Sequence, residues 1–483
     1  HHGGYAPYRA IHTTCRIAVQ KPLTMKCRII PLFAAVASVP MLFGATPLNA
    51  QEAQRWTLEE CIAYAFEHNI EVKQAELDVQ TKRLTRSDAG WAYAPDISAS
   101  SSYSFSSGRV LDPTTYEFVE HQSVNGTSTS VGASVTLFNG MRNLHNLERS
   151  RLDLRAALLG VEKARNDIRL NITAYYLEIL CAEENIRNAE QTVETLKIQE
   201  EKTRKSVEMG KVTSADLLQI RSQLANAENT LLSARNSYDI ARLNICQLLE
   251  IEDYTTFHTV APSDNILGNT PMPVSTDALL ASAQQLPEVE SARLGIDIAR
   301  RDLRIARSSY YPTLSLSAGY GSSYSDARQK MFMNPDGTYR YEAYPFAEQY
   351  KDNASSYISV SLNVPIFGRL TTRHNVQRQK IAVRQAEYAL RTTEKQVNKE
   401  ATQALIDSRT AWDKYLSSQK YVASAEEAAR QMEQRYNLGA ATVVDYNTAL
   451  DALVEAQVQL LQAKYEYIFK TEIIKFYLDS NKK

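Results

Sequence analysis

Proline and glycine are scarce in this chain and unevenly placed. Its 483 residues include only 17 glycines and 15 prolines, and both fractions lie below the average for proteins. No proline occurs between Pro113 and Pro262, and none follows Pro365. A fold of many short strands and tight turns needs more of these residues than the chain contains, so such a fold is excluded. Two very long uninterrupted segments are implied, and only helices run that long.

Charge and cysteine usage exclude further classes. Charged residues make up 23% of the chain and apolar residues 44%, so the chain is not disordered. The formal net charge is −1, and no dense basic patch is evident, which argues against a nucleic-acid partner. The five cysteines form no CxxC pair and no His/Cys cluster at zinc spacing. No Ser/His/Asp order, phosphate loop or HExxH motif is present, so we expect neither an enzyme nor a cofactor.

The beginning of the sequence resembles an export signal. Residues 25–50 combine a short basic start, an apolar stretch and a small-residue cleavage site. The apolar stretch is too short for a typical membrane helix. We expect residues 1–24 to be an upstream extension or a cloning remnant. The mature protein is therefore expected outside the cytoplasm, either in soluble form or as a β-barrel in an outer membrane.

The chain contains an internal duplication. Leu137-Phe138 matches Ile366-Phe367, and Gly210 matches Gly439, both at an offset of 229 residues. The equal spacing implies long helices of equal length in the two halves. It predicts a first repeat over 51–262, a linker over 263–275 and a second repeat over 276–483.

Each repeat is predicted to contain a helix, two strands, a long helix, a tight tip and a further helix. The first helix is expected to begin at the capping box of Thr57 and to end near Pro95. The strands are expected at about 97–107, 128–138, 313–324 and 356–366. The long helices are expected at about 141–209 and 369–438, and the helices that follow the tips at about 214–250 and 443–479.

The predicted strands alternate apolar residues with serine, glycine and threonine over about ten residues. This period of two, with apolar residues outward and small polar residues inward, is typical of a transmembrane barrel strand. An ordinary half-buried sheet is the alternative, but four strands with the same serine-rich face favour the barrel. The polar segments 108–127 and 326–354 are expected to be loops at the outer face.

The long helices carry apolar residues at heptad spacing, as coiled coils do. At about 1.5 Å per residue, each would be roughly 100 Å long. Gly140 and Gly368 are expected where the strands meet these rods. A coiled-coil protein without a sheet is the alternative, and the strands between the helices argue against it.

The tips share the pattern Gly-x-x-Thr-x-x-Asp. A glycine can end a helix in the left-handed conformation, and a threonine followed three residues later by an acid can cap the next helix. The two aspartates have two possible roles: capping alone, or capping combined with a negative constriction that selects cations or locks a pore. The tip residues are Gly210, Thr213 and Asp216 in the first repeat, and Gly439, Thr442 and Asp445 in the second.

The duplication, the tips and two further motifs carry a family resemblance. These motifs are Leu-Phe-Asn-Gly at 137–140 and Ile-Phe-Gly at 366–368. Together they resemble the TolC-type outer-membrane efflux family over roughly 55–480. The resemblance implies a mainly α fold with a transmembrane β-barrel portion. Three chains would supply a twelve-stranded barrel that continues as a long α-helical periplasmic tunnel.

The resemblance also implies partners and a gate. The partners would be two further copies of the chain, outer-membrane lipid, a periplasmic adaptor and an inner-membrane pump, in a Gram-negative type envelope. Tyr436 and Asp445 match the family's gate tyrosine and first aspartate ring, whereas Ala441 and Thr448 stand at the positions of its arginine and second aspartate ring. Asp216 is a further gate candidate. The expected tip turns and adaptor contacts are Gly210, Thr213, Gly439 and Thr442.

The predicted function is passive conduction of exported substrates across the outer membrane, most simply as the outer part of a tripartite efflux system. A type I protein secretion duct of the same fold is one alternative. A soluble periplasmic coiled-coil scaffold is the other.

Overall fold

Residues 55–111, 118–260 and 274–479 are described by the computed structural model. They belong to one unit, Ala53–Lys483, which is separate from His1–Glu52. The expected upstream extension (1–24) and signal peptide (25–50) lie outside the described residues, as does nearly all of the expected linker.

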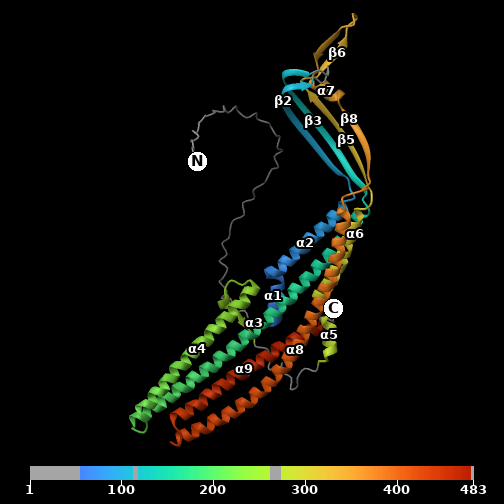
Figure 1. Ribbon diagram of the computed structural model, residues 1–483. Coiled ribbons are helices and arrows are strands. Elements are labelled where there is room, and N and C mark those ends of the chain that lie inside the picture. The colour runs from blue at the N-terminus through green and yellow to red at the C-terminus, as the bar shows by residue number, and fades with distance from the viewer. Residues whose placement is uncertain (1–54, 112–117, 261–273, 480–483) are drawn as a thin grey trace, which may run out of the picture. The chain divides into compact units, whose positions relative to one another are not determined.

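The two halves repeat the same main elements in the same order (Figure 1). The first half contains β1 (Arg55–Trp56), α1 (Leu58–His68), α2 (Ile70–Trp91), β2 (Asp96–Leu111), β3 (Phe118–Phe138), α3 (Arg142–Glu208), α4 (Ser214–Leu249), the 3-10 helix η1 (Tyr254–Thr256) and β4 (His258–Thr259). The second half contains α5 (Thr276–Ala283), α6 (Pro287–Ser308), β5 (Thr313–Ser325), β6 (Gln329–Met333), β7 (Tyr339–Ala343), α7 (Phe346–Asp352), β8 (Ser355–Asn363), α8 (Thr371–Asn437) and α9 (Val443–Asp479).

The expected single helix from Thr57 to Pro95 is wrong, because the chain breaks it at Asn69. The capping box at Thr57 does start α1. Asn69 is extended, and its side-chain oxygen accepts hydrogen bonds from the backbone of Glu71 at 2.9 Å and Val72 at 3.3 Å. Its amide also donates to the carbonyl of Leu248 at 2.9 Å. Asparagine competes well for backbone groups in this way, so it ends α1 and caps α2.

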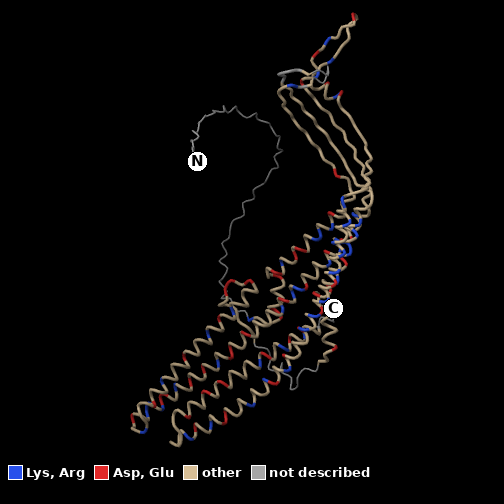
Figure 2. The backbone as a smooth tube through the Cα atoms, viewed as in Figure 1, with Lys and Arg blue, Asp and Glu red and all other residues tan. Residues whose placement is uncertain are grey.

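Four antiparallel strands form the main sheet in the order β2-β3-β5-β8. The register places Ile97, Ala133, Ala318 and Ile358 in one row across the sheet. Serine and threonine hydroxyls pair between β2 and β3, as at Ser102 and Ser128 with 2.8 Å between oxygens. The strands carry almost no charged residues, whereas charges cover the helices (Figure 2). Among the described strands β2 and β8 are the two edges, each paired on one side only.

The strand limits differ from the expected ones. β2 and β3 continue through much of 108–127, which was expected to be a loop, with a register shift at Gly108. Backbone pairing needs no apolar face, so the hairpin extends beyond the alternating pattern that predicted it. At the opposite end β8 stops at Asn363 rather than 366, because its partner β5 begins at Thr313 and Pro365 has no N–H to donate.

The segment 326–354 is also not a simple loop. It contains a small hairpin, β6 with β7, and the short helix α7. The amide of Gln349 on α7 binds back to β5: its oxygen accepts from the Ser325 N–H at 2.6 Å, and its nitrogen donates to the Ser325 carbonyl at 3.0 Å. A buried glutamine thus fastens the segment to the main sheet.

Two consecutive left-handed residues turn the chain from strand to helix in each half. They are Gly140 and Met141 before α3, and Arg369 and Leu370 before α8. Both pairs are 229 residues apart, so the structural partner of Gly140 is Arg369. Gly140 and Gly368 both lie between a strand and a long helix, as expected, although Gly368 itself is not the left-handed counterpart of Gly140. Each left-handed pair sits at the N-cap of a long helix.

The long helices α3 and α8 each have 67 residues, which corresponds to roughly 100 Å. Each returns through a tip into a second helix, so that α3 packs along α4, and α8 along α9 (Figure 1). None of the helices in the described ranges has an apolar stretch long enough to cross a membrane.

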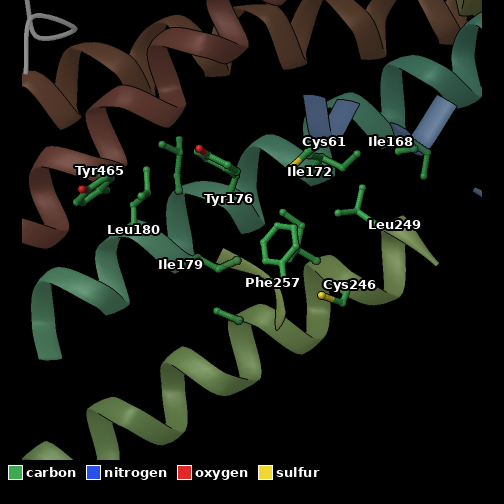
Figure 3. Packing of buried hydrophobic residues seen from close by; sticks show 14 of the residues in the cluster. Cys61, Ile168, Ile172, Tyr176, Ile179, Leu180, Cys246, Leu249, Phe257 and Tyr465 are labelled. Carbon is green, nitrogen blue, oxygen red and sulfur yellow. The ribbon is translucent and has the colours of Figure 1, made fainter. Parts of the chain in front are cut away.

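The largest buried cluster joins α1, α3, α4 and α9 (Figure 3). Tyr176 lies at its centre, and its hydroxyl donates toward the carbonyls of Val260 at 2.6 Å and Trp56 at 3.0 Å. These contacts fasten the parallel pair of β1 and β4 to α3. Burial raises the pKa of Tyr176 to about 12 and that of Cys61 to about 12. Both groups therefore stay neutral at physiological pH, as packing residues do.

Candidate functional site at the hairpin tips

The first tip is built by Gly210 and a capping box. Gly210 adopts a φ of 70° after α3, and the next residue, Lys211, donates to the Ser206 carbonyl at 2.9 Å. A left-handed glycine of this kind closes a helix with little strain. Thr213 then starts α4. Its hydroxyl and its N–H both donate to the carboxylate of Asp216, at 2.8 and 2.9 Å.

The second tip repeats this geometry. Gly439 has a φ of 72°, and the N–H of Ala440 donates to the Arg435 carbonyl at 2.8 Å. The hydroxyl of Thr442 donates to Asp445 at 2.7 Å, and its N–H donates to the same carboxylate at 3.1 Å. These hydrogen bonds lower the pKa of Asp445. Capping by both aspartates is therefore confirmed, and a gate role for them stays a prediction.

The gate candidates are only partly brought together. Tyr436, at the end of α8, stacks on Tyr446 of α9 with 5.4 Å between ring centroids and 7° between ring planes. Tyr446 follows Asp445 directly, so Tyr436 and the carboxylate of Asp445 lie in the same tip. Thr448 is exposed and its hydroxyl donates to the Val444 carbonyl of its own helix at 2.9 Å. Asp216 belongs to the other tip.

Sequence reasoning missed Tyr446. Its side chain is only 4% exposed, and burial raises its pKa to about 12. The available signal was its place beside Asp445, opposite Tyr436 across a short turn. The stacked pair holds the two helices of this hairpin together where they turn.

A groove of about 920 Å³ lies between α3, α4 and α9, and it too was not predicted. Its walls combine apolar residues with amides and hydroxyls. Residues such as Asn188, Thr192, Asn226, Ala227, Leu453 and Gln457 line it. At one end Glu184 of α3 accepts from Tyr465 and Lys464 of α9, at 2.8 and 3.2 Å. The alanines in the heptad pattern were the available signal, because small residues leave room between helices.

The described residues contain no group of three or more His, Cys, Asp or Glu that could hold a metal ion. The three described cysteines are free thiols.

The sequence matches the family of outer membrane efflux proteins over residues 62–249 and 279–472. Outer membrane protein TolC of Escherichia coli is 23% identical, covering 90% of this chain and 85% of its own length. Alkaline protease secretion protein AprF of Pseudomonas aeruginosa is 25% identical, covering 78% of this chain and 75% of its own. The outer membrane channel CmeC of Campylobacter jejuni has a similar structure, with a TM-score of 0.73 at 18% identity, covering 88% of this chain and 85% of its own.

The chain belongs to the outer membrane efflux protein family. The TolC-type resemblance seen in the motifs is thereby confirmed, and so is the mainly helical fold with its strand portion. The protein is an outer-membrane efflux channel.

Proposed function

We propose that three copies of this chain form a passive duct through the outer membrane. The main sheet carries this proposal. Its four strands cannot close a barrel, which needs about eight, whereas three copies supply twelve. The outer edges of β2 and β8 have no partner strand among the described strands, so we expect β2 of one copy to pair with β8 of the next.

The two faces of the sheet suit lipid on one side and water on the other. Ile97 and Ile358 in the apolar row are 70% and 79% exposed in the single chain. An apolar face of this kind is suited to contact with lipid. The opposite face carries serine, threonine and glycine and would line the duct. Outer-membrane lipid is thus one partner of the proposed assembly.

The helical hairpins are the proposed docking surface for a periplasmic adaptor, which would connect the duct to an inner-membrane pump. The groove between α3, α4 and α9 combines apolar and hydrogen-bonding walls, as suits a helical partner. Gly210, Thr213, Gly439 and Thr442 hold the tips in a fixed shape at the ends of both hairpins. These turns would present the adaptor with a preformed surface.

The gate is proposed to consist of Tyr436 and Asp445 from each copy, with Asp216 and Thr448 as lesser contributors. Thr448 has no charge, and its hydroxyl is engaged in its own helix. Replacing Tyr436 by Ala and Asp445 by Asn together is expected to raise single-channel conductance. The matched control is Tyr388→Ala/Asp413→Asn, which makes the same two changes at exposed positions of α8 away from the tips. An unchanged conductance would refute the gate.

A protein secretion duct is the second candidate, and the similarity to the secretion protein AprF favours it. A strain that lacks this chain separates the two functions. Loss of a secreted protein from the medium would indicate secretion, whereas sensitivity to small toxic compounds would indicate efflux.

Native mass spectrometry of the detergent-extracted protein tests the duct itself. The expected mass is that of three chains. Recovery of the chain as a monomer from the soluble periplasm would instead support a coiled-coil scaffold.

A further inference from the structure

A hollow lined by three arginines lies where α2 approaches the sheet. It has a volume of about 600 Å³ and lies between the last turns of α2 and the first turns of α3. We call it the arginine hollow, and it is lined by Arg83, Arg86, Ser87, Gly90 and Trp91 of α2 and by Leu147 and Arg151 of α3. No acidic residue is among them. Figure 2 shows Lys and Arg gathered on the helices near the sheet.

The three arginines of the hollow differ from nearby arginines in having no partner within the described chain. Neighbouring arginines are used structurally: Arg149 binds Asp302 at 2.7 Å, and Arg301 binds Glu148 at 2.5 Å. Arg83, Arg86 and Arg151 make no hydrogen bond or ion pair with any described residue, and all three are exposed. Three unpaired guanidinium groups around one hollow form a site for an anion.

The arginine hollow adjoins a second hollow that reaches the sheet. Trp91 lines both the arginine hollow and the second hollow. The other walls of the second hollow include the hydroxyl residues Ser134, Thr136 and Ser315, together with the acidic residues Asp88 and Asp96. The three hydroxyl residues belong to the serine-rich face, which lines the duct in the proposed assembly. The arginine hollow is therefore placed along the path of the exported solute, and this inference rests on the proposed function.

The hollow also offers an aromatic surface and free space. Trp91 is 72% exposed, which leaves its ring available to a ligand. A Cβ built on Gly90 meets nothing within 4 Å, so glycine leaves this part of the wall open. The volume falls within the range of small-molecule sites. Ring stacking on Trp91 and anion binding by the arginines are both possible for one ligand.

We propose that the arginine hollow binds organic anions that carry a sulfonate, phosphate or carboxylate group on an aromatic ring, as they pass through the duct. Arginines lining a pore favour anions. The sequence did not reveal the site, because Arg151 reaches the hollow from a different helix than Arg83 and Arg86.

Block of the ionic current by naphthalene-1,3,6-trisulfonate tests the proposal on the full-length protein in planar bilayers. The probe is added from the side of the sheet. The variant Arg83→Gln/Arg86→Gln/Arg151→Gln is expected to raise the half-blocking concentration at least tenfold. The control Arg187→Gln/Arg409→Gln/Lys420→Gln removes the same charge from exposed positions elsewhere on α3 and α8 and is expected to shift it less than twofold.

Two further arms separate charge from ring and shape. Gly90→Leu fills the hollow without changing its charge and is expected to weaken the block at least fivefold. Sodium sulfate, at a concentration that supplies the same total anionic charge, is expected to block the current far less than the trisulfonate. Equal block by sulfate, or wild-type block in the arginine variant, would overturn the proposal. A protein that carries no current refutes the duct instead, and calorimetric titration of the solubilised protein with the trisulfonate then tests the hollow separately.

Discussion

Gly140→Ala is expected to destabilise the junction between β3 and α3 far more than alanine at Gly368. Gly140 has a φ of 67°, where an L-residue costs roughly 1–2 kcal/mol. A Cβ there would lie 2.5 Å from the Ser308 carbonyl oxygen and 2.8 Å from the Cβ of Tyr311. Relieving this overlap costs about 1–3 kcal/mol more. The expected total loss of unfolding free energy is about 2–5 kcal/mol.

The second junction supplies matched controls. A Cβ on Gly368 meets nothing within 4 Å, and Gly368 does not have a positive φ. Gly368→Ala is therefore expected to change stability by less than about 0.5 kcal/mol. Arg369, the structural partner of Gly140, has a φ of 48°. Arg369→Gly relieves the backbone strain of a left-handed non-glycine residue, but it also raises the conformational entropy of the unfolded chain. The two effects oppose each other, so the free energy of unfolding is expected to change by no more than about 1 kcal/mol.

Thermal unfolding followed by circular dichroism in detergent measures these differences. An unfolding entropy of about 2.1 cal/mol/K per residue over about 430 residues gives roughly 1 °C per kcal/mol. Gly140→Ala is expected to melt about 2–5 °C below the wild type, and both controls within about 1 °C of it. Equal melting of Gly140→Ala and Gly368→Ala would refute the reasoning.

Three further predictions concern other contacts. Asn69→Ala removes the cap of α2 and leaves the Leu248 carbonyl without its partner, so denaturant unfolding is expected to show a loss of about 2–4 kcal/mol; a loss below about 0.5 would contradict the capping role. Tyr176→Phe removes the hydroxyl that binds the carbonyls of Trp56 and Val260 at the β1–β4 pair. Backbone hydrogen exchange of β1 and β4 is expected to become faster, and the free energy of unfolding to fall by about 1–2 kcal/mol. Unchanged exchange in these strands would contradict the role of the hydroxyl. The pKa of Asp445 is lowered on folding, so its stabilising effect is present above its ordinary pKa and lost as pH falls through the lowered one. Relative to its intrinsic rate, backbone hydrogen exchange in the first turn of α9 is expected to accelerate in the wild type as the pH falls from the ordinary pKa of aspartate through the lowered pKa of Asp445. In Asp445→Ala this turn is expected to exchange fast at every pH. Protection that does not change with pH in the wild type would contradict the prediction.

The repeating patterns of the sequence predicted the repeating parts of the fold. Alternation of small polar and apolar residues identified all four strands of the main sheet, and heptad spacing identified the long helices. The turn chemistry of Gly210 and Gly439 located both tips. Each of these features depends on residues that are close in sequence, so a local pattern is sufficient to predict it.

Features that depend on distant residues were missed. Asn69 breaks its helix partly because Leu248 offers it a carbonyl. The left-handed conformation of Arg369 carries no sequence signal, since arginine rarely adopts it. The arginine hollow needs Arg151 from a second helix beside Arg83, and only the packing of α2 on α3 brings the two together.

Single-channel recording most directly tests the central claim that the chain forms a duct. Protein extracted from the outer membrane and purified as a three-chain assembly is inserted into planar bilayers. Discrete current steps are predicted, small while the tips are closed and larger for Tyr436→Ala/Asp445→Asn. An assembly of three chains that carries no current in either form would contradict the account.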